Sequence, residues 1–226
     1  MRKALLLTVC ILLSVAKGAQ AGLAADLYLG GNFNQNIPLV IEGNAVYDGG
    51  GSIGPSTLNG IGLRWVYCVG RTTTVYVPAD YVETWVTTTG EVYGNGFGPS
   101  ASLNTVPQAA QIAYLLTRYA DTPQVDQVAL QAAIWHEVEP TVSLSASSTH
   151  YQNYQTYLAN IGDGTAYVSL YDWLSPSQDG TRFYQGLVTS PGQQIFTQSE
   201  VPLPSAVWLL SSGFIGLAAM RKRLKK

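Results

Sequence analysis

Cys68 is the residue with the clearest capacity for chemistry in this 226-residue sequence. The only other cysteine, Cys10, lies in an apolar N-terminal run that we expect to be removed as part of a signal peptide. A single thiol in an exported protein cannot form an intramolecular disulfide. It is therefore an inert core residue, one half of an intermolecular bridge, or a reactive group.

Gln131 is the second candidate, because it places a polar amide beside the apolar stripe of a predicted helix. It precedes Trp135 by one helical turn and follows Cys68, which ends the strand-like run LRWVYCV, by 63 residues. A thiol attacks an amide carbonyl only when it is held against it and kept from water. A strand and a helix must therefore present this pair to each other.

The two histidines, His136 and His150, offer an enzymatic alternative. Either could pair with Cys68 in a thiol hydrolase or a transglutaminase-like enzyme. His136 follows Gln131 by five residues, about 140° further round the helix, so these two side chains should face different partners. Two histidines also give poor support for a zinc site, and we expect no metal or cofactor.

The expected elements are β-rich, then helical, then β-rich again. Turn signals separate apolar or β-branched runs that are typical of strands. The strands are expected at 37–41, 61–69, 72–77, 82–88, 166–173, 182–188 and 193–197. The glycine pattern of Gly49, Gly51 and Gly54 is followed by Pro55, so it is predicted to form a loop and not a dinucleotide-binding turn.

Helical periodicity appears in the middle of the chain. Helices are expected at 107–119, 124–138 and 151–158, and Thr122 with Pro123 is expected to cap the second of them. The fold class is therefore α+β, a β-rich sandwich or barrel with an inserted helical subdomain. The part between the two terminal signals is long enough for one core.

Two segments together resemble the Cys-Gln thioester domains of bacterial surface adhesins. Residues 67–69 (YCV) match the aromatic-Cys-Val/Ile segment of a strand, and Gln131 with 133–135 (AIW) matches the TQxAIW segment of a helix. The resemblance extends over residues 61–138. Leu130 stands where the family usually has Thr, and Gly70 where it often has an acidic residue.

The resemblance implies a thioester between the Cys68 sulfur and the Gln131 carbonyl, formed with loss of ammonia. It implies an adhesin that reacts once with an amine, a lysine or polyamine on a surface or matrix target, and is not an enzyme. The aromatic side chains that could shield the bond are Trp65, Tyr67, Tyr114 and Trp135. A structural matrix protein with an inert Cys68 is the remaining alternative.

Both ends of the chain carry targeting signals. Residues 1–21 predict a signal peptide that is cleaved between Ala21 and Gly22, which leaves a domain over 22–200. Residues 201–226 begin with Val201, Pro202, Leu203 and Pro204 and end in an Arg-Lys cluster, and they resemble a PEP-CTERM sorting signal. That resemblance implies transient inner-membrane insertion, processing by an exosortase, and secretion to the cell surface of a Gram-negative bacterium. An ordinary tail anchor is the alternative.

The charge of the exported part restricts its partners. Between the two signals remain four arginines, no lysine and all 14 acidic residues, a formal charge of −10. This charge argues against nucleic acid or anionic lipid as a partner. A domain without ε-amines cannot crosslink to its own copies through them, although acidic exported proteins are also often poor in lysine.

Overall fold

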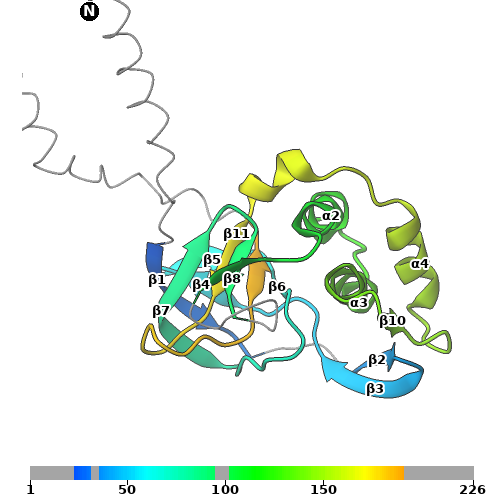
Figure 1. Cartoon of the computed structure of the whole chain (residues 1–226), viewed down its shortest axis with the longest axis horizontal. Coiled ribbons are helices and arrows are strands. Elements are labelled where there is room, and N and C mark those ends of the chain that lie inside the picture. Colours follow the sequence, from blue (N-terminus) through cyan, green and yellow to red (C-terminus); the bar gives the residue numbers. More distant parts are fainter. Residues whose placement is uncertain (1–22, 32–35, 95–101, 191–226) are drawn as a thin grey trace, which may run out of the picture. The chain divides into compact units, whose positions relative to one another are not determined.

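The main sheet combines strands from both ends of the domain. The structure, a computed structural model, describes residues 23–31, 36–94 and 102–190. In this part of the chain seven strands form one antiparallel sheet in the order β5-β4-β1-β7-β11-β12-β6 (Figure 1). They are β1 (Leu23–Leu29), β4 (Ser56–Leu58), β5 (Ile61–Leu63), β6 (Val66–Cys68), β7 (Ala79–Thr87), β11 (Asp172–Ser175) and β12 (Leu187–Thr189). The sheet is nearly closed and barrel-like, with β5 and β6 at its edges.

Two smaller sheets complete the strands of the described residues. One has the order β10-β2-β3, and the other pairs β8 with β9. Their strands are β2 (Asn36–Ile41), β3 (Asn44–Gly49), β8 (Glu91–Tyr93), β9 (Leu103–Thr105) and β10 (Val142–Leu144). Glu42 and Gly43 join β2 to β3 with φ values of 49° and 82°. Two positive φ values in a two-residue loop are typical of the type I′ turn, whose twist suits a hairpin.

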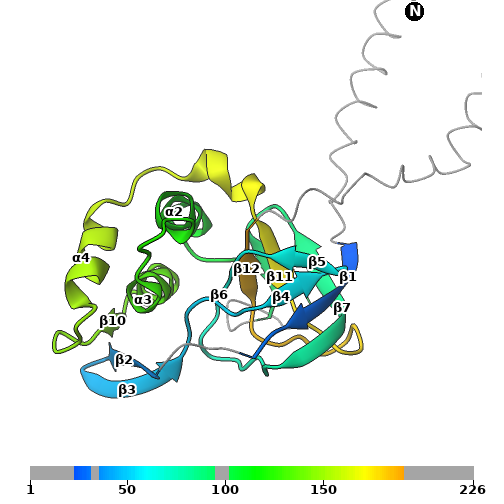
Figure 2. The same ribbon diagram turned by 180° about the vertical axis from the view of Figure 1, so that it is seen from behind.

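The helices form an insertion into the main sheet. They lie in sequence between β7 and β11, which are neighbours in that sheet. Figures 1 and 2 show α2, α3 and α4 together beside the sheet, with the β2–β3 hairpin close to α3. The helical elements are α2 (Ala109–Leu115), the π-helical turn η1 (Leu116–Ala120), α3 (Gln127–Val138), α4 (Tyr151–Ala159) and the 3-10 helix η2 (Thr165–Leu170).

Several expectations are confirmed. The class is mixed helix and strand with a β-rich, barrel-like sheet. The strand at 37–41 is β2, the strand at 82–88 falls within β7 except for its last residue, and the helix at 151–158 is α4. The helix at 107–119 is present as α2 followed by η1, while the run 61–69 is interrupted at Arg64 and Trp65 and forms both β5 and β6.

The predicted start of the second long helix was wrong. α3 begins at Gln127, because Asp126 is its N-cap and accepts a hydrogen bond from the Ala129 N–H at 3.1 Å. The Thr122 hydroxyl instead donates to the Tyr119 carbonyl at 2.8 Å, within the turn that precedes the helix. A side-chain oxygen that accepts a bond from the first turn stabilises a helix start, and in this chain that oxygen belongs to Asp126 and not to Thr122.

The strand expected at 72–77 was also wrong. Its Tyr76 N–H donates to the Tyr81 hydroxyl at 2.8 Å, and that hydroxyl donates to the Tyr76 carbonyl at 3.0 Å. A side chain therefore occupies the groups through which a strand would pair.

Two strand predictions near the C-terminal end were only partly right. Most of 166–173 is the 3-10 helix η2, since the Tyr167 N–H bonds to the Gly164 carbonyl at 2.8 Å and only the last two residues enter β11. Residues 182–188 start in a turn in which the Arg182 N–H donates to Asp179, and β12 begins only at Leu187. Local turns therefore replaced strands that the residue types favoured.

Several predictions lie outside the described residues. These are the signal-cleavage site at Ala21 and Gly22, the strand at 193–197, and the sorting motif at Val201–Pro204. Within the described ranges, no helix is both long enough and apolar enough to cross a membrane.

Burial of α3 on every side explains where the candidate site can form. All residues from Val128 to Trp135 are buried, although the sequence predicted an apolar stripe on one face. A helix that is buried all round lies inside a protein and not on its surface. Gln131 therefore has no exposed face, and its amide must find its partners within the protein.

Candidate functional site

Cys68 ends β6, at one edge of the main sheet. Its neighbour across the ladder is Leu187 of β12, and β6 has no second strand beside it among the described residues. An edge strand leaves a row of backbone N–H and C=O groups without ladder partners. Cys68 is nevertheless fully buried, so its backbone groups need partners from elsewhere.

Gln131 supplies both partners. Its Nε2 donates to the Cys68 carbonyl at 2.7 Å, and its Oε1 accepts from the Cys68 N–H at 3.1 Å. A primary amide carries a donor and an acceptor side by side, as a peptide group does. The Gln131 side chain thus takes the place of a neighbouring strand, and the structure brings together the two residues that the sequence singled out.

Besides β6 and α3, the loop after β3 also contacts the site. The Gly51 N–H also points to Gln131 Oε1, at 3.4 Å. A Cβ atom on Gly50 would lie 2.7 Å from Trp135 Cη2 and 2.8 Å from Gln131 Cγ, so the loop packs directly on the helix. The sequence predicted only a loop here; its signal was three consecutive glycines, of which the first is the last residue of β3.

Gln127, one turn before Gln131 on α3, fixes the surroundings of the pair. Its Oε1 accepts hydrogen bonds from the Tyr67 hydroxyl at 2.5 Å and from the Ser52 N–H at 3.2 Å. It thereby ties the loop and β6 to the same face of α3. Every buried side-chain nitrogen and oxygen of the described residues has a hydrogen-bond partner.

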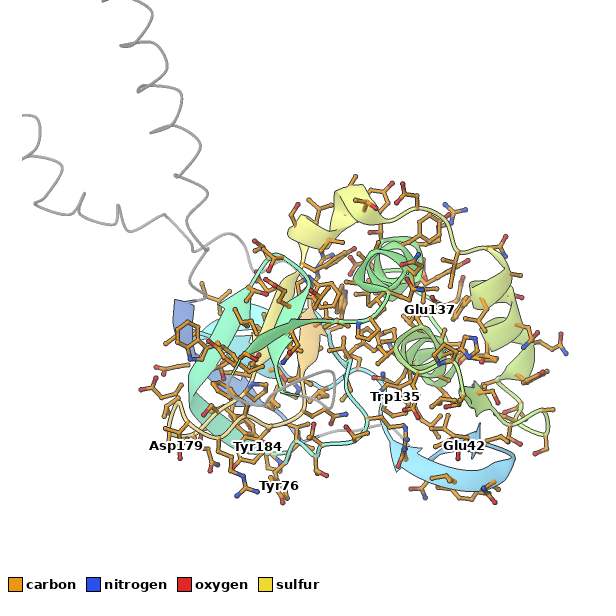
Figure 3. The ribbon with its side chains drawn as sticks, viewed as in Figure 1. Glu42, Tyr76, Trp135, Glu137, Asp179 and Tyr184 are labelled. Atoms are coloured by element: carbon orange, nitrogen blue, oxygen red, sulfur yellow. The ribbon has the colours of Figure 1, made fainter. Side chains whose placement is uncertain are left out.

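Two of the four predicted shielding aromatics, Tyr67 and Trp135, contact residues of the site, and a third, Trp65, packs on the Tyr67 ring. Trp135 donates its Nε1–H to the Gly70 carbonyl at 3.2 Å, and the Trp65 and Tyr67 rings are 5.5 Å apart. Figure 3 shows Trp135 and Glu137 leaving α3 on opposite sides. The fourth, Tyr114 on α2, is only half-buried, and its ring lies against Gly162.

Arg71 anchors the segment that follows Cys68 through two ion pairs, which the sequence did not indicate. Its guanidinium lies 3.3 Å from the Asp48 carboxylate of β3 and 3.3 Å from that of Glu139 at the end of α3. The carbonyl of the preceding residue, Gly70, also accepts a hydrogen bond from Gln185. These contacts hold residues 69–71 in place on both sides of the buried pair.

Burial controls the state of the thiol. Removal from water raises the pKa of Cys68 to about 12, because the thiolate loses its hydration. An unreacted Cys68 is therefore a neutral thiol at pH 7, inaccessible to reagents in solution. Any reaction of this sulfur must be with a group that the fold itself places beside it.

The histidines have other partners. His136 Nδ1 lies 2.7 Å from the Val142 carbonyl, and His150 Nδ1 lies 2.9 Å from the Asp126 carboxylate that caps α3. In the described part of the chain neither histidine is hydrogen-bonded to Cys68. The same residues contain no group of three or more His, Cys, Asp or Glu side chains that could hold a metal ion.

In comparisons with known proteins, the chain matches no protein-family model, no curated protein and no solved structure.

Proposed function

We propose that Cys68 and Gln131 form an internal thioester, with which the exported protein attaches itself covalently to an amine-bearing partner. The observation that supports this most is the fixed position of the Gln131 amide against the Cys68 backbone, 2.7 and 3.1 Å away on its two polar atoms. Both residues are fully buried. Holding two groups in a reactive arrangement away from water is the main requirement of such an acyl transfer.

The bond-forming step balances without a cofactor. The Cys68 sulfur adds to the Gln131 Cδ atom, the S–C bond forms, and the bond from Cδ to Nε2 breaks. The thiol proton leaves with that nitrogen as ammonia. Because the raised pKa of Cys68 excludes a standing thiolate, the proton must move while the sulfur attacks.

In the capture of a target, nitrogen is the nucleophile and sulfur is the leaving group, the reverse of the bond-forming step. A primary amine adds to the same carbonyl carbon, the S–C bond breaks, and Cys68 returns to a thiol as an amide forms at residue 131. Each molecule reacts once, which makes the protein a chemical adhesin and not a turnover enzyme. The lysine-free domain offers no ε-amine of its own to compete with a lysine or polyamine on the target.

A structural role is the alternative that the same hydrogen bonds favour. Gln131 satisfies the edge of β6 whether or not the sulfur reacts, and a buried thiol packs as a small apolar group. The two roles differ in mass, since only the thioester requires the loss of ammonia, about 17 Da, from the intact chain. Mass spectrometry of the intact protein therefore tests the proposal.

The terminal signals supply the location that this function needs. We propose that the signal peptide exports the chain, that an exosortase processes the C-terminal segment, and that the domain reaches the cell surface. Mature protein recovered from its host is expected to begin near Gly22 and to lack 221–226, because both segments are processing signals. Mapping of the terminal peptides checks this. Recovery of 221–226 on surface-located protein would indicate a tail anchor instead.

A further inference from the structure

We infer that the loop after β3 supplies an oxyanion hole for the acyl group of residue 131, in which the Gly51 N–H acts together with the Cys68 N–H. The inference rests on the proposed thioester and adds to it a named catalytic group, remote in sequence from both reacting residues. Negative charge develops on Oε1 whenever sulfur or an amine adds to the Gln131 carbonyl. Backbone N–H groups aimed at such an oxygen are a recurrent means of lowering the barrier to acyl transfer.

The geometry points to this role. Gln131 Oε1 accepts from the Cys68 N–H at 3.1 Å and from the Gly51 N–H at 3.4 Å. The two donors come from different segments and converge on one carbonyl oxygen, whereas capping the edge of β6 needs the Cys68 donor alone. Hydrogen bonds to a resting carbonyl are longer than those to an oxyanion, and they tighten as charge builds on the oxygen.

Glycine is required at both positions of this loop for different reasons. Gly51 has a φ of 105°, which L-residues with a side chain rarely adopt, and Gly50 has no room for a Cβ atom between Trp135 and Gln131. The Ser52 N–H bonds to Gln127 Oε1 at 3.2 Å, and the Ile53 N–H to the Val66 carbonyl at 2.9 Å. These anchors hold the Gly51 N–H in place before any reaction begins.

The same hole serves formation and use of the bond. In both steps the tetrahedral carbon is that of residue 131, so its oxygen lies between the same two donors. The Cys68 carbonyl, which accepts from the departing Nε2 in the resting site, is then placed to accept from the N–H of an incoming amine. Two N–H groups thus position the oxygen, and one C=O positions the nitrogen.

Gly51→Ala in the exported chain tests the inference, with Gly49→Ala as its matched control. Gly49 is the residue two positions earlier, it is exposed, and a Cβ atom there would meet nothing within 4 Å. Two rates are measured by intact mass: formation of the thioester after cell-free synthesis, and its reaction with methylamine. Loss of one oxyanion donor slows acyl transfer by roughly 10²–10³-fold, and since alanine displaces this donor without deleting it, we expect both rates to fall at least about tenfold. Gly49→Ala should react at the wild-type rate.

An ester in place of the amide between residues 50 and 51 covers the case in which Gly51→Ala does not fold. It removes the N–H alone, and it can be introduced by ligating a synthetic peptide, 22–67, to a chain that begins at Cys68. Rates equal to wild type in the folded ester variant would overturn the inference and leave the proposed thioester standing. A wild-type protein that forms no thioester would overturn both.

Discussion

Cys68→Ala is expected to abolish covalent capture of amines and to leave the fold in place. Wild-type protein incubated with methylamine should gain one adduct, about 14 Da above the mass of its sequence, because methylamine replaces the ammonia at residue 131. The variant has no sulfur to hold the acyl group and should gain none. Losing the sulfur also removes the crosslink between residues 68 and 131, a cost of about 2–4 kcal/mol by analogy with a disulfide, while circular dichroism should show the same fold.

The position of the adduct distinguishes this reaction from enzymatic labelling. Trypsin cuts after Arg118 and Arg182, so residue 131 lies in one peptide, 119–182, and Cys68 lies in another, 65–71. The adduct should be found at residue 131 alone. Equal amine uptake by Cys68→Ala would contradict the thioester, and loss of uptake in His136→Ala or His150→Ala would favour the enzyme alternative.

Gln131→Ala is expected to have the largest effect on stability. It removes the crosslink between residues 68 and 131 and leaves the Cys68 N–H without its Oε1 acceptor, in a site that water does not reach. A buried polar group that loses its partner costs about 1–3 kcal/mol, so we expect a loss of roughly 2–5 kcal/mol in the free energy of unfolding. Chemical denaturation followed by fluorescence measures it.

The same variant should also return the chain to the full mass of its sequence, with Cys68 as a free thiol. Because burial holds the pKa of that thiol near 12, it should resist alkylation until the protein is denatured. Gln127→Ala is the matched control, one turn away on the same helix. It removes contacts to Tyr67 and Ser52, so it should lower stability and slow thioester formation, but the thioester should still form and the mass should stay about 17 Da below that of the sequence. A Gln131→Ala protein as stable as wild type would contradict the account of how β6 is capped.

The candidate pair could be recognised in the sequence because its signals are local. Cys68 follows a run of β-branched and aromatic residues, and Gln131 interrupts an otherwise apolar helix. Both elements formed as expected, although α3 begins at Gln127 because the Asp126 carboxylate outweighs the Thr122-Pro123 signal. Local propensity was sufficient to predict an element where the residue pattern and the packing favoured the same structure.

The rest of the site depends on contacts between distant segments, which a single sequence does not display. Nothing near Cys68 shows that β6 is an edge strand, or that Gln131 would supply its missing ladder partner. The Gly51 N–H comes from 80 residues before Gln131, and Arg71 pairs with Asp48 and Glu139 on two other elements. Strand β1 was not predicted at all, and residues 166–173 had the composition of a strand but formed mostly a 3-10 helix.

The intact mass of freshly purified wild-type protein tests the thioester most directly. We expect a mass about 17 Da below that of the processed sequence, since ammonia leaves when the Cys68 sulfur displaces the Gln131 amide. Protein that has already reacted would instead carry a glutamate or an amine adduct at residue 131. A full sequence mass, with unmodified glutamine at position 131 in the peptide 119–182, would contradict the proposal and leave Gln131 as the structural partner of an inert Cys68.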